Sequence, residues 1–579
     1  MNNLGAKVLF NRLVHHGVKY VFGYPGGAIL PVLNEFHSQN KIKYILSRTE
    51  LGGSFMAEGY SKATKKPGVI MVTSGPGAIN VMTSLQNALS DGNALLALSG
   101  QVSTNVLGTN AFQEADIIGI SKPCTKWNTM IKSNDTINNS IDFAFKQMLN
   151  KRYGPVLIDL PKNIMSSNSS IQKSEILVNK KKSKVPNSIR LSLDNFNQMI
   201  HSAKRPLILA GNGIYQSCAI DDLREFAKMY NIPVTTTLLG LGVFNEKHHL
   251  SLKMLGMHGS YCANMAIQNC DLLINFGSRF DDRIIGDPKK FAPKAKIIHV
   301  DIEPDNINKT IQSHYYIKED CKTLINKLID YEIHPNYNYD YYTNCKWIQQ
   351  IDKWKQIKFN FPDKKDVLQG REVISCLNQI IHNIKENTTI IADVGAHQMW
   401  AAQFIDYNYP KVKFITSGGL GSMGFALPAS IGYKIGVDSK NEHVICICGD
   451  GGFTMSFIEL ITAVENKVPV KILIINNSYQ LMVKMWQDKF YDKRQVGVKM
   501  NNPDFAKVAN SLGCHSMTIN SKERLKEQLE EFINYKGPIV ANVITDENES
   551  VLPMVSPGKA LDDMILEEDD QPLTGDAPC

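Results

Sequence analysis

The sequence predicts an α/β protein that contains three doubly wound domains, each built on a parallel sheet. Short apolar segments alternate with amphipathic helix patterns along most of the chain, as in PVLIDLPK and RPLILAGNGI. Glycine-rich turns follow many of these segments, which is typical of strand ends in α/β folds. The length of 579 residues exceeds what one hydrophobic core usually holds and fits three domains of ordinary size.

Shifts in composition indicate where the domains begin and end. The first domain is expected over residues 1–165 and is followed by a linker rich in Ser, Asn and Lys. The second α/β block opens at RPLILAGNGI and is expected over residues 190–330. An aromatic-rich segment, HPNYNYDYYTNCKW, follows it and is expected to pack on a domain surface. The third domain is expected over residues 370–555, and the acidic residues 556–579 are expected to form a mobile tail.

Composition and charge argue against several classes of protein. No apolar run reaches the roughly 18 residues of a membrane helix, and a helix pattern starts at once without a signal or transit segment. We therefore expect a cytoplasmic location and no membrane partner. The 11 cysteines are scattered without a CxxC pair, which argues against disulfides and zinc. The net charge is +7, but the basic run KKKSK lacks interleaved aromatics, so no nucleic-acid partner is expected.

The stretch VICICGDGGF carries the main clue to function. Val444–Cys448 has the pattern of a buried strand, so Asp450 lies where that strand ends, the position at which α/β proteins bind ligands. A tight turn would also explain an acid among glycines. However, a helix pattern and a second strand follow, and that strand ends in Asn476 and Asn477. A carboxylate and an amide at two such strand ends suit Mg²⁺, which often shares its site with phosphate groups.

Motifs along nearly the whole chain resemble those of thiamine-diphosphate-dependent enzymes, and within them the catalytic subunits of the acetolactate (acetohydroxyacid) synthase family. The motifs include YPGGA, TSGPGA, AFQE, LGMHG, RFDDR, HQMWAAQ, SGGLGSMG and MVKMWQ. GDG followed by NN is general to thiamine-diphosphate enzymes, whereas RFDDR, HQMWAAQ and MVKMWQ are more particular to this family. The resemblance implies a pyrimidine-binding first domain, a central FAD-binding domain and a diphosphate-binding third domain.

The resemblance also implies a reaction and partners. Members of the family decarboxylate pyruvate and join the two-carbon unit to pyruvate or 2-ketobutyrate, giving 2-acetolactate or 2-aceto-2-hydroxybutyrate for valine, leucine and isoleucine biosynthesis. A homodimer or tetramer of catalytic subunits and a small regulatory subunit are implied as well. Two alternatives stay open: a degenerate homologue that binds cofactor without turnover, and a flavin-free or differently specific carboligase or pyruvate oxidase.

Roles in catalysis and metal binding follow from the resemblance residue by residue. Glu50, in RTELGG, would be the carboxyl that serves the aminopyrimidine of the cofactor. The carbonyl of Gly421 would accept a hydrogen bond from the aminopyrimidine, and Met423 would hold the two cofactor rings bent, although it could instead fill a gap in the core. The metal ligands would be Asp450, Asn477 and the backbone carbonyl of Tyr479.

Further positions match cofactor and substrate contacts of the family. The cofactor positions outside the central domain are Tyr24, Pro25, Gly26, Gly27, Gln113, His397, Gly418, Gly419, Gly451, Gly452, Met482 and Val483. Those inside it, assigned to FAD, are Gly211, Gly213, Thr237, Leu238, Met257, His258, Gly277, Arg279, Asp281, Arg283, Asp301 and Asp320. The substrate positions are Phe112, Lys162, Arg279 and Trp486. Arg279 would pair with the acceptor carboxylate and Trp486 would favour 2-ketobutyrate, with ordinary core packing as the alternative for Trp486.

The chain departs from the family pattern at five positions. Around the catalytic Glu, Thr49 replaces a His, Leu51 a Gln and Gly53 an Ala. Ala396 replaces a Gln expected near the diphosphate. Leu481 replaces a Gly, and its side chain would crowd the cofactor if that position used a positive φ.

Overall fold

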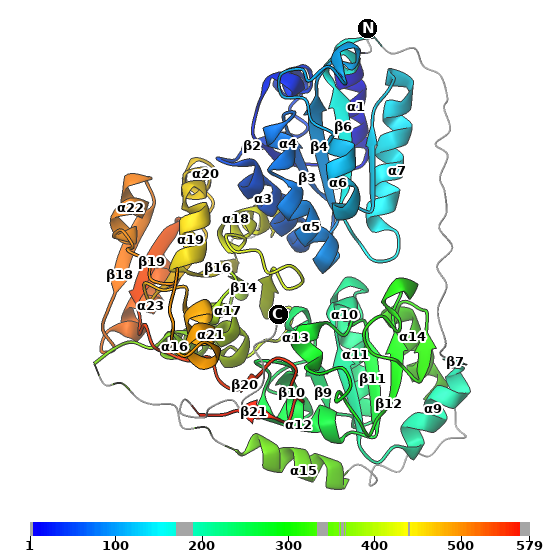
Figure 1. The fold of residues 1–579 in the computed structure, drawn as a ribbon, viewed down its shortest axis with the longest axis vertical. Helices are drawn as coiled ribbons and strands as arrows, with labels where there is room; N and C mark the ends of the chain where they lie inside the picture. Colours follow the sequence, from blue (N-terminus) through cyan, green and yellow to red (C-terminus); the bar gives the residue numbers. More distant parts are fainter. Residues whose placement is uncertain are drawn as a thin grey trace.

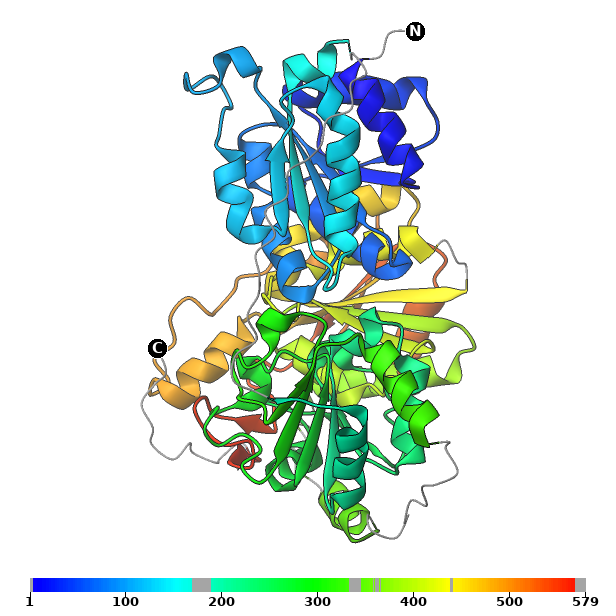
Figure 2. The same cartoon turned by 90° about the vertical axis from the view of Figure 1, so that its right-hand side faces the viewer.

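The computed structural model describes residues 4–567, apart from 169–188, 333–344, 358, 360–363, 365 and 438–440. Within these residues three parallel sheets define a first, a central and a third domain, which confirms the predicted fold class. Figures 1 and 2 show the first domain at the top, the central domain below it and the third domain beside both. Among the described residues, no helix has the length and apolar character needed to cross a membrane.

The first and third domains have the same strand order. Across the first sheet the strands are β2 (Lys43–Leu46), β1 (Tyr20–Gly23), β3 (Gly68–Val72), β4 (Leu95–Gln101), β6 (Val156–Pro161) and β5 (Trp127–Met130). Across the third they are β15 (Val412–Thr416), β14 (Asn387–Ala392), β16 (Glu442–Gly449), β17 (Lys471–Asn476), β19 (Ile539–Ile544) and β18 (His515–Ile519). Both sheets therefore reverse their strand order at one point, between β1 and β3 and between β14 and β16.

The central sheet follows the order of dinucleotide-binding folds, with one strand added at an edge. Its strands are β10 (Ser251–Met254), β9 (Val234–Thr236), β8 (Pro206–Ala210), β11 (Leu272–Phe276), β12 (Lys296–Val300), β13 (Tyr315–Ile317) and β7 (Ile189–Arg190). The order reverses between β8 and β11. Apolar side chains from both faces of the sheet are buried under helices, as expected for a parallel sheet.

Helices flank both faces of each sheet (Figure 1). In the first domain they are α1 (Gly5–His15), α2 (Leu30–Ser38), α3 (Glu50–Thr64), α4 (Pro76–Ile79), α5 (Met82–Asp91), α6 (Ile117–Ser121), α7 (Ile137–Leu149) and α8 (Lys162–Ser166). In the central domain they are α9 (Leu193–Ser202), α10 (Asn212–Gln216), α11 (Ile220–Met229), α12 (Tyr261–Asn269), α13 (Asp282–Ile285) and α14 (Cys321–Glu332). In the third domain they are α16 (Gly370–Asn383), α17 (Ala396–Phe404), α18 (Ala426–Val437), α19 (Asp450–Ser456), α20 (Leu460–Glu465), α21 (Leu481–Phe490), α22 (Phe505–Ser511) and α23 (Leu525–Asn534).

Two segments outside the sheets pack on the central domain. Helix α15 (Cys345–Lys355) follows the aromatic-rich segment, and the indole of its Trp347 donates to the carbonyl of Pro206 at 3.0 Å. The expectation of a mobile tail from residue 556 is wrong for residues 556–567. There β21 (Met564–Ile565) pairs with β20 (Met554–Val555), and Leu561 is buried in a core of the central domain. The rest of the expected tail lies outside the described residues.

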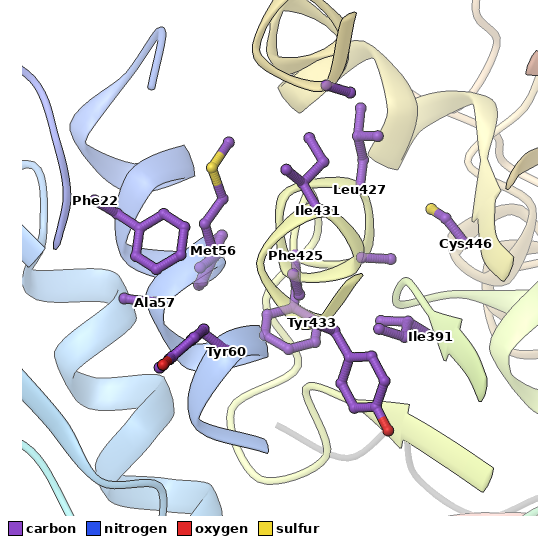
Figure 3. Close-up of a cluster of buried hydrophobic side chains, with 14 of the residues drawn as sticks. Phe22, Met56, Ala57, Tyr60, Ile391, Phe425, Leu427, Ile431, Tyr433 and Cys446 are labelled. Atoms are coloured by element: carbon purple, nitrogen blue, oxygen red, sulfur yellow. The ribbon is translucent and has the colours of Figure 1, made fainter. Parts of the chain in front are cut away.

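The first and third domains meet where α3 crosses α18. A β-carbon at Gly432 would collide with the Met56 carbonyl and lie 2.7 Å from the Met56 Cα, and one at Gly59 would lie 2.7 Å from the carbonyl carbon of Ala429. The glycines therefore allow backbone to touch backbone. Figure 3 shows the apolar side chains around this crossing, which come from both domains and include Phe22, Met56, Ala57, Tyr60, Phe425, Leu427, Ile431 and Tyr433.

We predict that Gly432→Ala destabilises the protein, because α3 and α18 must separate to admit the new methyl group. Within an isolated helix the same change would stabilise by about 1 kcal/mol. Here we expect the free energy of unfolding in guanidinium chloride to fall by about 1–3 kcal/mol. Gly27→Ala is the control, since a β-carbon there would meet no atom within 4 Å. An equal or higher stability of Gly432→Ala would contradict the close crossing.

Candidate active site

Several of the residues expected to form the site lie at the three points where strand order reverses. Tyr24, Pro25, Gly26 and Gly27 follow β1, and the loop that begins at Thr73 follows β3. His397 lies on α17 after β14, and Asp450 directly follows β16. In the central domain Gly211 and Gly213 follow β8, and Gly277 and Arg279 follow β11. These are the carboxyl ends of parallel strands, where doubly wound sheets bind ligands.

Asp450 and Asn477 lie at the ends of two neighbouring parallel strands, β16 and β17. Both side chains are buried. Asp450 Oδ1 accepts from the Gly451 N–H at 2.9 Å, and Asn477 Oδ1 accepts from the Tyr479 N–H at 3.1 Å. Ser478 between them has a φ of 59°, so the chain turns sharply after the strand. The predicted strand-end placement of the acid and the amide is confirmed.

The side chains available at this edge suit a hard cation. Among the residues that the structure describes, no three His, Cys, Asp or Glu side chains cluster in a geometry that could hold a metal. A cation here would thus depend on one carboxylate together with amide and carbonyl oxygens, which Mg²⁺ accepts and zinc does not favour.

The sequence analysis missed Asn502, which contacts the predicted metal ligand. Its amide donates to Asp450 Oδ2 at 2.8 Å and to Asn476 Oδ1 at 3.0 Å. Asn476 in turn donates to Asn542 Oδ1 at 3.0 Å. Asn542 is a polar residue within the apolar run IVANVI, a signal that was available in the sequence. No local pattern marks Asn502, which lies in a loop far along the chain.

Around this edge, glycines let neighbouring side chains approach closely, and a histidine offers an unpartnered ring nitrogen. A β-carbon at Gly452 would lie 2.6 Å from Asp393 Oδ1, and one at Gly451 would lie 3.0 Å from Gln480 Cδ. The His397 ring lies beside Gly449 and is buried, and its Nε2 has no hydrogen-bond partner. Burial lowers the pKa of His397 to about 3, so the ring is neutral at physiological pH. An unpartnered buried ring nitrogen of this kind fits a polar ligand group such as a phosphate.

Asp393 holds the glycine-rich loop that carries Gly421 and Met423. It accepts from the N–H groups of Val394, Gly424 and Ala426, each at 2.9 Å. Burial raises the pKa of Asp393 to about 6, and these hydrogen bonds oppose the shift. Gly421 has a φ of 75°, a conformation that favours glycine. Met423 is half-buried and belongs to none of the hydrophobic cores of the described residues.

Glu50 is the first residue of α3 and faces the loop after β3. Its Oε2 accepts from the Asn80 amide at 3.1 Å. A β-carbon at Gly77 would lie 3.3 Å from Glu50 Oε1 and 2.9 Å from Thr73 Cγ2. A β-carbon at Gly26 would lie 2.6 Å from Thr73 Oγ1. Glu50 and the glycines of YPGGA and TSGPGA therefore pack closely at one place in the first domain.

A cavity of about 990 Å³ lies where the three domains meet and collects most of the other predicted residues. From the central domain it is lined by Gly213, Thr237, Leu238, Met257, His258, Gly277, Arg279, Asp281, Arg283, Asp301 and Asp320. From the third domain it is lined by Gly418, Gly419, Gly421, Met482, Val483 and Trp486. Trp486 also packs against a hydrophobic core, and its expected role in substrate preference stays a prediction.

Several predicted residues do not line this cavity. They are Tyr24, Pro25, Gly26, Gly27, Glu50, Phe112, Gln113, Lys162, Gly211, His397, Met423, Asp450, Gly451, Gly452, Asn477 and Tyr479. Of these, Phe112 is 88% exposed, and Lys162 is exposed as well. Within one chain, neither Glu50 nor the edge at Asp450 lines the cavity.

Arg152 lines the cavity and was missed by the sequence analysis. Its guanidinium donates to the carbonyls of Leu89 and Ser90 at the end of α5. Burial lowers the pKa of Arg152 to about 10, and the positive charge of Arg279 adds to this effect. Two half-buried guanidinium groups in one cavity favour an anionic ligand, because such a ligand would offset their mutual repulsion.

Comparison with known proteins identifies the family. Models of thiamine pyrophosphate (thiamine diphosphate) enzymes match three stretches: the N-terminal TPP binding domain at residues 4–120, the central domain at 193–328 and the C-terminal TPP binding domain at 393–543. A mitochondrial acetolactate synthase of Schizosaccharomyces pombe is 41% identical over 97% of this chain and 86% of its own length. The large subunit of acetolactate synthase isozyme 2 from Escherichia coli K12 is 37% identical over 97% of this chain and 99% of its own. This chain belongs to the acetolactate synthase family.

The structure explains how this family member tolerates its departures around Glu50. Thr49 caps α3, since its Oγ1 accepts from the Gly52 N–H at 2.9 Å. Gly53 is needed beside Ser47, because a β-carbon there would lie 2.6 Å from Ser47 Oγ. Leu51 is half-buried and packs against the core between the two domains. With these three residues in place, Glu50 still accepts the hydrogen bond from Asn80.

The condition under which Leu481 would crowd the cofactor, a positive φ at this position, is not met. Leu481 is the first residue of α21 and is not among the residues with positive φ. Its side chain is buried in a core of the third domain together with Met485. The glycine of the family pattern is therefore not required for backbone conformation in this chain. Ala396 opens α17 in the same way and is buried in the same core.

We predict that Asn502→Ala weakens Mg²⁺ binding, because Asp450 then loses the hydrogen bond that orients its carboxylate. Residues that support a metal ligand typically contribute about 10- to 100-fold in affinity. The measurement is a Mg²⁺ titration of thiamine diphosphate binding by isothermal calorimetry. Asn501→Ala is the matched control, since Asn501 is the exposed neighbour. An unchanged Mg²⁺ affinity in Asn502→Ala would rule out this supporting role.

Proposed function

We propose that this chain decarboxylates pyruvate and transfers the two-carbon unit to a second 2-keto acid. Pyruvate as acceptor would give 2-acetolactate, and 2-ketobutyrate would give 2-aceto-2-hydroxybutyrate, both for branched-chain amino acid biosynthesis. One observation carries the proposal: Glu50 follows a strand of the first sheet, and Asp450 and Asn477 end two neighbouring strands of the third, in a chain that matches its relatives over 97% of its length.

We assign the roles of the polar residues as follows. Thiamine diphosphate, when bound, supplies the electron sink for decarboxylation. Asp450, Asn477 and the Tyr479 carbonyl would hold Mg²⁺ and the diphosphate. Glu50 would hold and deliver a proton at Oε1, because Asn80 already engages Oε2. His397 would contact the diphosphate through its unpartnered Nε2.

Residues of the glycine-rich loop would orient the cofactor. The Gly421 carbonyl would accept a hydrogen bond from the cofactor. The positive φ of Gly421 changes the direction of the chain at this carbonyl. Met423 would hold the cofactor bent, and its absence from the hydrophobic cores favours this role over core packing. These two residues would position the cofactor and transfer no proton themselves.

We also propose that the 990 Å³ cavity holds FAD. The central sheet has the strand order of dinucleotide-binding folds and reverses beside Gly213 and Gly277. Arg152 and Arg279 would face the pyrophosphate of a dinucleotide. The ring of His258 is buried with an unpartnered Nδ1, and burial lowers its pKa to about 4. Since the reaction involves no net oxidation, the flavin would be structural.

Exposed apolar side chains support a homodimer or a tetramer built from it. In the first domain, Tyr24 of the YPGGA segment is 41% exposed and Phe112 of the AFQE segment is 88% exposed. In the third domain Met455 and Val483 are more than half exposed. We propose that the first domain of one subunit faces the third domain of another, so that Phe112, Gln113 and Lys162 reach a site that their own chain does not complete.

The names of the relatives bear on further partners and on location. Relatives from Escherichia coli and the red alga Cyanidium caldarium, the latter 39% identical over 97% of this chain, are named large subunits. Those names imply a small subunit, and we propose a regulatory one for this chain. The relative from Schizosaccharomyces pombe is named as mitochondrial. The cytoplasmic location expected from the sequence stays a prediction.

The proposal is tested by acetolactate formation from pyruvate with and without thiamine diphosphate, Mg²⁺ and FAD. We expect product that depends on thiamine diphosphate and falls by about 100-fold or more in Glu50→Gln, which removes the proton carrier. The exposed Glu531→Gln is the control. Bound cofactors without product, even with a small subunit added, would favour a degenerate homologue. Oxidase activity in place of acetolactate would favour a pyruvate oxidase.

We predict that Trp486→Leu reduces the preference for 2-ketobutyrate over pyruvate as acceptor. The indole lines the cavity, and its loss removes contact with one extra methyl group, which corresponds to about tenfold or more in relative rate. The measurement is the ratio of the two products when both acceptors compete. Trp354→Leu on α15 is the matched control, because Trp354 lies outside the cavity lining. An unchanged product ratio would leave only the packing role.

A further inference from the structure

A buried carboxylate of the third domain reaches into the first domain beside Glu50. Glu459 ends the 3-10 turn Phe457–Glu459 and is fully buried. Its Oε1 accepts from the Thr49 N–H at 2.9 Å, from Thr49 Oγ1 at 3.0 Å and from the Arg48 N–H at 3.1 Å. Its Oε2 lies 3.0 Å from the Arg48 nitrogen and accepts from Thr462 Oγ1 at 2.8 Å. One side chain thus satisfies two backbone donors and two hydroxyls.

The donors belong to the turn that leads directly into Glu50. Arg48 and Thr49 connect β2 to α3, and Glu50 is the first residue of that helix. The Thr49 hydroxyl also accepts from the Gly52 N–H, so it links the Glu459 carboxylate to the first turn of α3. Hydrogen bonds to an ionised carboxylate are about twice as strong as neutral ones, so Glu459 restrains this turn strongly.

Gly52 is shaped to admit this carboxylate. A β-carbon at Gly52 would collide with Glu459 Oε1 and lie 2.7 Å from Glu459 Cδ. Because residue 52 is a glycine, the Glu459 carboxylate can occupy the space that a side chain there would fill. Thr49, which departs from the family pattern, supplies two of the four donors, its N–H and its hydroxyl. Together these residues form a socket for Glu459, defined here as Arg48, Thr49 and Gly52.

We propose that Glu459 is a positioning residue for Glu50. By holding the socket, it fixes the direction in which the Glu50 side chain leaves α3, although Glu459 itself does not contact Glu50. The proposal rests on the role of Glu50 in the proposed function. It goes beyond that function because it assigns the placement of the catalytic carboxyl to a residue of the domain that carries the metal ligands.

The test is Glu459→Gln in the full-length protein, since the amide nitrogen cannot accept from these donors. Three quantities are measured: backbone amide exchange at Arg48 and Thr49 by mass spectrometry without cofactor, the affinity for thiamine diphosphate with Mg²⁺, and the deuterium exchange rate of the C2 proton of the bound cofactor. We expect faster amide exchange, unchanged affinity and C2-proton exchange slower by about tenfold or more. The proposal would be overturned if Glu459→Gln exchanged the C2 proton at the wild-type rate. It would also be overturned if a loss of cofactor affinity accounted for the slower exchange.

A matched control and a second variant separate positioning from general damage. Glu465→Gln removes the half-exposed carboxylate that pairs with the Arg48 side chain and leaves the socket intact, so it should behave as wild type. Gly52→Ala pushes the Glu459 carboxylate out of the socket without removing its charge, and it should reproduce Glu459→Gln. If Glu459→Gln does not fold, the same three measurements on Gly52→Ala test the proposal by themselves.

The Glu50→Gln variant distinguishes this proposal from the proposed function. If Glu50→Gln leaves C2-proton exchange unchanged, the role of Glu50 fails, and amide exchange in the socket still reports whether Glu459 holds the turn. If exchange depends on Glu50 but is normal in both socket variants, the positioning role is overturned and the function stands.

Discussion

The arrangement of the three domains depends on Asp91, the last residue of α5. Its carboxylate accepts from the N–H groups of Gly418 and Gly419 of the third domain, at 3.3 and 2.6 Å. Its backbone carbonyl accepts from the side-chain amides of Asn212 and Gln216 of the central domain, at 3.0 and 3.3 Å. One buried residue of the first domain thus holds both the glycine-rich loop and the start of the central fold.

Parallel sheets explain why the remaining chemistry gathers at few places. Every strand of a sheet presents its carboxyl end at the same edge, and the reversal of strand order opens a crevice there. Glycines at these strand ends add no side chains. Buried carboxylates such as Asp393 and Glu459 accept hydrogen bonds from the backbone of the loops. The loops that bind ligands are therefore fixed by polar contacts from a second layer of residues. This division lets the binding surfaces stay open while their backbone stays fixed.

The sequence alone predicted the fold class and the strand-end position of Asp450, because both depend on local periodicity and turn residues. It missed Asn502, Arg152, Asp91 and Glu459, whose partners lie far away in the sequence and follow no local pattern. The tail expectation failed for residues 556–567 because the acidic composition outweighed the apolar Leu561 and Ile565, which are buried in cores of the central and the third domain. The concern over Leu481 was resolved only by its helical backbone, since residue type cannot give φ.

The matching strand orders of the first and third sheets have a consequence for the origin of the chain. Helix α3 follows the second strand of its sheet, and α18 follows the second strand of the other, so the two crossing helices are topological counterparts. Two copies of one domain that associate through the same helix produce this pseudo-twofold arrangement, as in an isologous pair. An internal duplication would produce such counterparts, with an acid at the start of one helix and a glycine-rich loop before the other. The turn that carries Glu50 and the glycine-rich loop then occupy equivalent positions in two domains of one topology.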